Sequence, residues 1–352
     1  MQGLPEILIE FLSKAVSFIN RSSKGIVAVI LKDGTENLVE NVYSDLSKVK
    51  ITEWTESNYD LISKCFMGSP IKVIVIRLAE NAADYSAGLT ILENRRFDYL
   101  AVPFANSTDT AAISSWIKAQ RLLRKDFKAV LANEAGDNEG IINLTTEDIK
   151  VGEKIYSTGA YTTRIAGILA GLSLSMSATY YVLTEVDDVK AVADPDAKIK
   201  AGELILINDG EKVKIGRAVN SLVTIAEPKN PSWKKIKIIE GQDMMNRDIS
   251  KTYADKYIGK VPNTYDNKML FFSAVGTYYT GLEKLNVLDP DFNNYMDIDV
   301  EAHAELITLA GLNPTEMKVK EIREYNTAST VYSAGQVKFL DAMEDSKMRI
   351  SM

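Results

Sequence analysis

Few residues of this sequence combine in the spacings that catalysis needs. Among the 352 residues there is one histidine, His303, and one cysteine, Cys65. A Ser-His-Asp site would have to be built on His303, and a zinc site of nitrogen and sulfur ligands lacks enough residues. His303 lies in the helical pattern VEAHAELITLAG, so we expect it on a helix surface or in the core. The sequence contains no G-x-S-x-G elbow, Walker A loop or G-x-G-x-x-G motif after a strand, so hydrolysis and nucleotide binding have no support.

An acidic stretch, DPDFNNYMDIDVE, begins like a calcium-binding loop. Oxygen-bearing side chains occupy its first, third and fifth positions, but Asn294 stands where the sharp turn needs glycine and Val300 where a bidentate glutamate is needed. We therefore favour a turn in which Asp297 or Asp299 caps a helix that begins at Val300. No metal and no cofactor is expected.

Composition limits the classes of partner and compartment. The hydrophobic fraction is 46 % and the charged fraction 25 %, as in ordinary globular proteins, and the length indicates about two domains. A formal net charge of -7 argues against a nucleic-acid partner, because such binding depends on Lys and Arg at phosphates. With Cys65 alone no intrachain disulfide can form, which fits a reducing compartment. The first residues lack a signal-peptide pattern.

One uncharged stretch has the length of a membrane span. It is IAGILAGLSLSMSATYYVLT, between Arg164 and Glu185, and it contains the pair Gly167 and Gly171. Five hydroxyl residues dilute its hydrophobicity, and its period changes from helical to alternating after Gly171. We predict a buried helix followed by a strand through TYYVLT, and no membrane insertion.

The first half of the chain alternates apolar strand patterns with helical patterns. This alternation predicts a mostly parallel sheet covered on both faces, an α/β core. The expected strands are 26–31, 71–78, 97–103 and 127–133, and the expected helices are 56–66, 83–95 and 109–125.

The second half has a different pattern. Two alternating runs around Asn208-Asp209-Gly210-Glu211 predict a hairpin near 203–225, and the proline-containing EPKNPSW indicates a domain boundary. Beyond it we expect an α+β domain. Its helices are predicted at 244–258, 262–285 and 300–310, and its strands at 335–341 and 347–352.

Both ends of the chain read as short alternating strands with charged faces of opposite sign. The two strands are expected to pair with acidic side chains opposite basic ones. Within one chain they could close one sheet, and between chains they would exchange strands into an assembly that grows as a helix. The predicted inter-subunit contacts are Glu6, Ile7, Ile9, Glu10, Phe11, Lys347, Met348, Arg349 and Ile350.

The order of segments resembles one known family, the tail sheath proteins of contractile bacteriophages and of phage-like R-type bacteriocins, including diffocin-like particles. The segments that carry the resemblance are GLPEILIEF, RSSKGIVAVILKD, GELILINDGEKVKIGRAVNSLVT, WKKIKIIEGQDMMNRDI and the short terminal strand. The likeness extends over nearly the whole chain, although no single segment is diagnostic.

The resemblance implies a domain plan. It comprises an N-terminal β arm at 1–20, an outer α/β core domain at 21–230, a tube-facing α+β domain at 231–341 and a C-terminal β arm at 342–352. The arms are expected to add strands to sheets of neighbouring subunits. Possible contacts with the tail tube are Lys318, Lys320 and Arg323, which we expect to be free to meet an acidic surface.

The resemblance also implies a structural function without catalysis. Copies of the chain are expected to polymerise helically around a tail tube protein, to meet baseplate and tail terminator proteins, and to contract so that the tube crosses a target cell envelope. The expected location is the tail of a virion or phage-like particle assembled in the host cytoplasm. The alternative is an α/β enzyme with a Rossmann-like sheet and an unknown substrate, since fold alone does not supply function.

Overall fold

The computed structural model describes residues 19, 25–35 and 39–351. The chain divides into two compact units. We call residues 23–243 with 341–352 the core domain, and residues 244–340 with Ile19 the C-terminal domain. The division falls inside helix α7 (Ile236–Lys256), later in the chain than the boundary predicted at residue 231.

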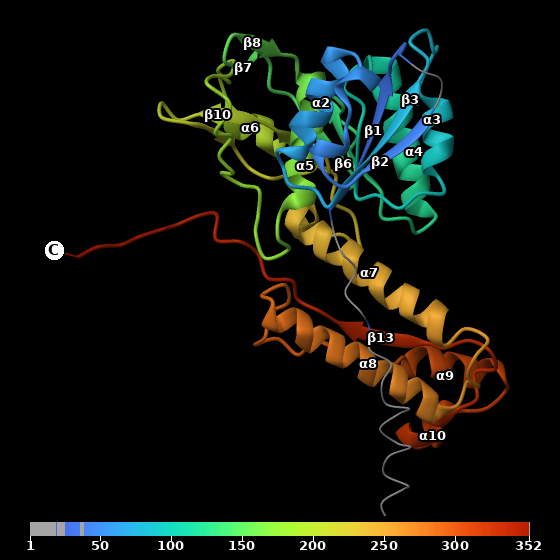
Figure 1. Ribbon diagram of the computed structural model, residues 1–352. Helices are drawn as coiled ribbons and strands as arrows, with labels where there is room; N and C mark the ends of the chain where they lie inside the picture. Colours follow the sequence, from blue (N-terminus) through green and yellow to red (C-terminus); the bar gives the residue numbers. More distant parts are fainter. Residues whose placement is uncertain (1–18, 20–24, 36–38, 352) are drawn as a thin grey trace, which may run out of the picture. The chain divides into compact units, whose positions relative to one another are not determined.

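A seven-stranded sheet forms the centre of the core domain, in the order β2-β3-β1-β4-β5-β6-β9 (Figure 1). The pairs are parallel, as predicted, except that β2 runs antiparallel to β3. Val29 of β1 sits between Val75 of β3 and Ala101 of β4. The strands are β1 (Ile26–Lys32), β2 (Val39–Tyr43), β3 (Lys72–Leu78), β4 (Tyr99–Ala101), β5 (Lys128–Ala132), β6 (Ile141–Leu144) and β9 (Glu203–Leu204).

Helices cover both faces of this sheet, which explains why its strands are apolar on both sides. Alternate residues of β1 enter two separate clusters: Val27 and Val29 pack with residues of α2 (Glu56–Phe66) and α5 (Thr158–Gly171). These two helices lie on the same side of the sheet in Figure 1. Ala28 and Ile30 pack on the opposite face, with residues of α3 and α4. The helices of that face are α3 (Ser86–Leu92) and α4 (Ser107–Leu122), and two 3-10 turns occupy Leu46–Lys48 and Ile51–Glu53.

The small residues that suggested a membrane span instead let α5 lie against the end of α2. A Cβ on Gly167 would stand 2.0 Å from the carbonyl oxygen of Cys65, and one on Gly171 would stand 1.8 Å from that of Gly68. Backbone therefore meets backbone at this contact, and a larger residue has no space. Within the described residues no helix is long and apolar enough to cross a bilayer.

The strand predicted through TYYVLT is wrong. After α5 the chain forms turns, and this stretch meets residues 213–215 through an isolated bridge at Val182 and backbone hydrogen bonds such as that from the Leu183 amide to the Val213 carbonyl at 2.9 Å. At its start the Thr179 amide donates to Ser177 Oγ at 3.1 Å, a local bond that favours a turn over a ladder.

Smaller elements complete the core domain. An antiparallel pair forms within the region predicted as a hairpin, with Leu206 opposite Ile215. These elements are β7 (Ile149–Val151) with β8 (Lys154–Tyr156), β10 (Leu206–Asn208) with β11 (Val213–Ile215), α6 (Pro195–Lys200) and a 3-10 turn at Pro231–Lys234.

The C-terminal domain is built from helices and a two-stranded antiparallel sheet of β12 and β13. Asp299 caps α9 by accepting from the Ala302 amide at 3.0 Å, so the capping prediction is confirmed for this residue. Every residue of β13 is exposed. The elements are the later part of α7, α8 (Tyr265–Lys284), β12 (Tyr295–Ile298), α9 (Val300–Leu309), a 3-10 turn (Pro314–Glu316), α10 (Val319–Glu324) and β13 (Ser333–Gln336).

Candidate functional site

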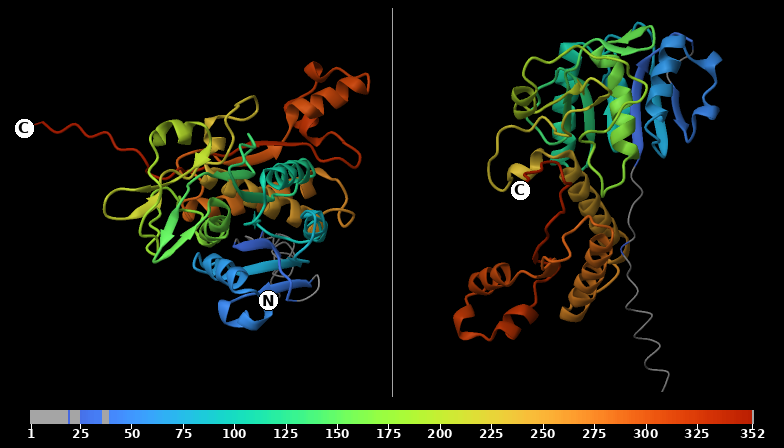
Figure 2. Two further views of the ribbon diagram at one scale, coloured as in Figure 1. Left: turned by 90° about the horizontal axis from the view of Figure 1, so that it is seen from above. Right: turned by 90° about the vertical axis from the view of Figure 1, so that its left-hand side faces the viewer.

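The last residues of the chain form an extended segment without helix or strand, visible at the end marked C in Figure 2. Met348 is 80 % exposed and Ile350 is 84 % exposed. An apolar side chain that is so exposed in an extended segment is suited to meet another chain. The strand predicted at 347–352 is not formed within the single chain.

The predicted N-terminal contacts lie outside the described residues. They are Glu6, Ile7, Ile9, Glu10 and Phe11. Their pairing with Lys347 and Arg349 therefore stays a prediction.

Just before this exposed end, a buried carboxylate anchors the chain to the core domain. The side chain of Glu344 is 5 % exposed. Its Oε1 accepts hydrogen bonds from Ser177 Oγ at 2.9 Å and Thr179 Oγ1 at 2.6 Å, and its Oε2 lies 3.3 Å from Lys235 Nζ. Two hydroxyls and an ammonium thus satisfy one carboxylate, the arrangement that a buried charge requires.

Two further acids flank Glu344 and complete what we call the carboxylate clamp, Asp341, Glu344 and Asp345. Asp341 also pairs with Lys235, and Asp345 lies 2.5 Å from Arg217. Burial alone would lower the pKa of Lys235, but the hydrogen bond that it donates to Asp341 and the charge of Glu344 outweigh burial and raise the pKa above its ordinary value. The clamp fixes the point from which the exposed end leaves the core domain.

Sequence reasoning missed the clamp. It assigned residues 342–352 to a β arm that leaves the domain, whereas Glu344 is docked on the core domain. Three acids within five residues, directly before an alternating strand pattern, were the available signal.

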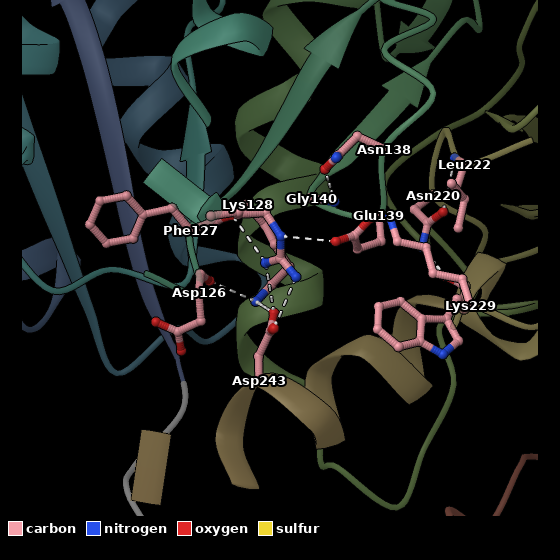
Figure 3. Close-up of polar contacts among 12 residues, drawn as sticks. Asp126, Phe127, Lys128, Asn138, Glu139, Gly140, Asn220, Leu222, Lys229 and Asp243 are labelled. Carbon is pink, nitrogen blue, oxygen red and sulfur yellow. Dashed lines mark hydrogen bonds and ion pairs between the residues drawn. The ribbon is translucent and has the colours of Figure 1, made fainter. Parts of the chain in front are cut away.

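A second charged site lies where the first turns of α7 meet β5 (Figure 3). Lys128, whose side chain is 1 % exposed, extends its Nζ to within 3.0 Å of Asp243 and 3.3 Å of Glu240. Tyr99 donates a hydrogen bond to the same Glu240. These contacts hold α7 against the sheet.

Arg121 and Lys229 extend this cluster. Arg121 binds Asp243 through two nitrogens, at 3.0 and 3.1 Å, and lies 3.4 Å from Glu139. Lys229 Nζ lies 2.8 Å from the other oxygen of Glu139. We call the set the ion cluster; its three cations and three carboxylates balance, and its members are Arg121, Lys128, Glu139, Lys229, Glu240 and Asp243.

The pKa shifts in the ion cluster are unsuited to proton transfer. Burial alone would lower the pKa of Lys128, but Glu240 and Asp243 raise it above its ordinary value. Burial would raise the pKa of Glu139, but the hydrogen bond from Lys229 and the charge of Arg121 lower it. General acids and bases need pKa values moved toward neutrality, whereas these two are moved away from it. The geometry is that of a structural tie.

The remaining chemical candidates are also held in the fold. His303 is fully buried, and its Nδ1 lies 2.9 Å from the carbonyl oxygen of Ile322, so it is a core residue. Cys65 is fully buried, which raises the pKa of its thiol. The described residues contain no group of three or more His, Cys, Asp or Glu side chains placed to hold a metal.

The predicted tube-contact residues do not share one environment. Arg323 binds Asp297 through two nitrogens, at 2.7 and 2.9 Å. The expectation that its charge is free is therefore wrong. Lys320 is 80 % exposed and lies 3.7 Å from Glu324. Lys318 is exposed. Of the three, Lys318 and Lys320 present their charge to solvent.

Comparison with known proteins gives matches along the whole chain. Residues 79–221 match the phage tail sheath protein central domain, and residues 228–352 match the phage tail sheath C-terminal domain. The tail sheath protein of Clostridium phage phiCD119 is 38 % identical over 363 aligned positions, which cover 100 % of both chains. The phage-like element PBSX protein XkdK of Bacillus subtilis is 30 % identical over 176 residues, covering 48 % of this chain and 38 % of that protein.

Solved structures share the fold at low sequence identity. A sheath tail protein from Desulfitobacterium hafniense superposes with a TM-score of 0.71 at 15 % identity, covering 85 % of this chain and 92 % of that one. The helical sheath of the anti-feeding prophage in its contracted state gives a TM-score of 0.69 at 12 % identity, covering 100 % and 97 %.

Proposed function

The chain belongs to the phage tail sheath family, and we propose that its extended ends join neighbouring copies into a helical sheath around a tail tube. The observation that carries this proposal is the exposed C-terminal segment. It begins at the carboxylate clamp and carries Met348 and Ile350 into solvent without a strand partner among the described residues. An unpaired strand of this kind is satisfied by pairing with another chain.

The small sheet of the C-terminal domain offers a place for such pairing. It has only β12 and β13, so each strand has a free edge in the described chain. Two-stranded sheets are marginally stable, and added strands cover their open donors and acceptors. We propose that arms from neighbouring copies extend this sheet, with Glu6 and Glu10 opposite Lys347 and Arg349 across the subunit boundary.

The same proposal assigns the two domains different surroundings. The core domain lies on the outside of the sheath, and the C-terminal domain faces the tube. Lys318 and Lys320 are the candidate contacts to an acidic tube surface. Baseplate and tail terminator proteins bound the sheath at its ends, and the particle assembles in the host cytoplasm.

Contraction then needs no cofactor. Its free energy is the difference in packing between an extended and a contracted arrangement of the same subunits, and the arms stay paired while the core domains repack. The contracted arrangement drives the tube through the target envelope.

Cysteine crosslinking tests the pairing directly, because the native Cys65 is fully buried. We expect the double variant Glu10→Cys with Arg349→Cys to give a ladder of disulfide-linked multimers in assembled sheaths. The matched control, Glu10→Cys with Lys190→Cys, moves the second thiol to an exposed lysine of the core domain, away from the β12–β13 sheet, and should give no ladder. A disulfide formed within single chains, or equal ladders of multimers in both variants, would refute pairing of the two arms between copies.

A further inference from the structure

A cavity of about 540 Å³ opens in the C-terminal domain between the end of α7, the start of α8 and the loop at 328–331. Three aromatic rings form its apolar wall. Tyr253 and Tyr257 stack at 5.9 Å, and both rings lie within 5.1 Å of the Phe271 ring. This volume is in the range of pockets that hold small organic groups.

The polar part of the cavity contains a lysine without a counter-charge. Lys268 is 4 % exposed, and the one hydrogen bond of its Nζ in the described structure goes to Thr327 Oγ1 at 3.0 Å. No carboxylate of the described residues lies within 4.0 Å of this Nζ. Burial lowers the pKa of Lys268, and no neighbouring acid opposes this effect.

A second polar group at the cavity is also unsatisfied. Asn263 donates through Nδ2 to Thr327 Oγ1 at 3.1 Å and to the Ala328 carbonyl at 2.8 Å, while its buried Oδ1 has no partner. Thr327 Oγ1 thus accepts from both Asn263 and Lys268. The cavity therefore offers the Lys268 ammonium as a donor, the Asn263 amide oxygen as an acceptor, and an apolar wall beside them.

The contrast with the ion cluster shows what is missing. Lys128 is 1 % exposed and Lys268 is 4 % exposed, but only Lys128 has carboxylates beside it, with Asp243 and Glu240 within 3.3 Å. A buried cation without such a partner is costly, and the cost is removed when an anion arrives. A carboxylate joined to an apolar body matches both the ammonium and the aromatic wall.

We propose that this cavity is a carboxylate-binding pocket, in which Lys268 binds the acid group and Tyr253, Tyr257 and Phe271 pack against an apolar body. The carboxylate can belong to a free organic acid or to an acidic side chain in an apolar peptide segment. This assignment stands independently of sheath assembly, because the pocket lies within one domain of one chain.

Two pairs of probes test the pocket on the full chain by calorimetry. The first pair is phenylacetate and the neutral phenylacetamide. The second pair is the capped peptide Ile-Leu-Ile-Glu-Phe, which is the sequence at residues 7–11, and the same peptide with Gln in place of Glu. We expect each acid to bind about tenfold or more tightly than its neutral analogue, the size of a charge-assisted hydrogen bond. Tighter binding of the peptide identifies a polypeptide side chain as the source, and binding of phenylacetate alone identifies a free acid.

Matched lysine variants show whether Lys268 is responsible. Lys268→Met keeps the side-chain volume and removes a buried charge, so the variant should still fold. A loss of binding in this variant would therefore not be caused by unfolding. We expect it to lose the preference for the acids, whereas Lys338→Met, at an exposed lysine paired with Asp289, should keep that preference. NMR of the Lys268 ammonium should show its pKa rise when the acid binds. Equal binding of acid and neutral probes, or an unchanged preference in Lys268→Met, would overturn the proposal.

Discussion

The two domains of this chain differ in how the backbone hydrogen-bonding groups of their strands are paired. In the core domain β1 and β3 each lie between two strands, and helices cover both faces of the sheet. In the C-terminal domain, among the described residues, β12 and β13 pair only with each other, and β13 is exposed throughout. The core domain is complete within one chain, whereas the sheet of the C-terminal domain is left open. That difference is what a subunit built for assembly requires.

Their buried charges differ in the same way. In the core domain, the ion cluster balances cations with carboxylates. In the C-terminal domain, Lys268 is buried beside a hydroxyl alone among the described residues. The stability of the core domain should therefore fall strongly when single buried residues are substituted. The stability of the C-terminal domain should depend more on the molecules that it binds.

Glycine substitutions should give the largest contrast. Gly167→Ala places a Cβ 2.0 Å from the Cys65 carbonyl oxygen, so α5 and α2 must separate, and we expect a loss of about 3 kcal/mol or more. Gly276→Ala, in α8, meets nothing within 4 Å and should gain about 0.5–1 kcal/mol in helix propensity. Urea unfolding measures both, and similar values for the two variants would contradict the described packing.

Removing one charge from the ion cluster should come next. Lys128→Met leaves Glu240 and Asp243 buried without their ammonium, and we expect a loss of about 3–5 kcal/mol. The control Lys190→Met breaks an exposed pair with Glu147 and should cost less than about 1 kcal/mol. Equal losses would mean that Lys128 is not buried in solution.

The pH dependence of stability should separate the domains. Hydrogen bonding from Lys229 and the charge of Arg121 outweigh burial and hold the pKa of Glu139 below its ordinary 4.5. Its contribution is thus present above that pH and is lost as the pH falls through the lowered pKa. For Lys268, burial lowers the pKa below 10.5, so the unfolded chain binds more protons and stability rises as the pH approaches 10.5.

Two substitutions test whether Glu139 and Lys268 cause these two changes of stability with pH. Glu139→Gln should flatten the acid limb of the stability curve, and Lys268→Met should flatten the alkaline limb. Thermal melts across the pH range measure both limbs. An alkaline limb unchanged by Lys268→Met would show that Lys268 is solvated.

The smallest effect on stability is expected at the surface of the C-terminal domain. Lys320→Ala removes a pair with Glu324 at 3.7 Å from a side chain that is 80 % exposed, and we expect a change below about 0.5 kcal/mol. Its binding to tube protein in co-sedimentation should nevertheless weaken. Unchanged co-sedimentation would remove Lys320 from the proposed tube contacts.

Periodicity predicted the core domain well because its signals are local. The helix Glu56–Phe66 was predicted with its observed bounds, and β1, β3, β4 and β5 all lie within a residue of the predicted strands or inside them. Short strands such as β7 and β12 were missed because they have too few residues to show a period. The start of α7 was also predicted too late, since its first turns are held by Lys128 and Arg121, far away in sequence.

The charged contacts of the functional-site residues join residues that are far apart in the sequence, so they were harder to predict. The charge of Arg323 is visible in the sequence, but its partner Asp297 depends on how β12 and α10 pack. The carboxylate clamp joins residues near the end of the chain to Ser177 and Arg217, which no local pattern connects. The uncharged stretch after Arg164 kept its predicted helix but not its strand, because hydroxyl side chains compete for local hydrogen bonds.

Electron microscopy of a truncated chain tests the central claim most directly. Residues 347–352 follow the carboxylate clamp and make no strand pairing in the described chain, so their deletion should leave both domains folded. We expect the full chain to form helical tubes or stacked rings, and the truncated chain to stay folded by circular dichroism but to form neither. Tubes from the truncated chain would contradict assembly through the exposed ends.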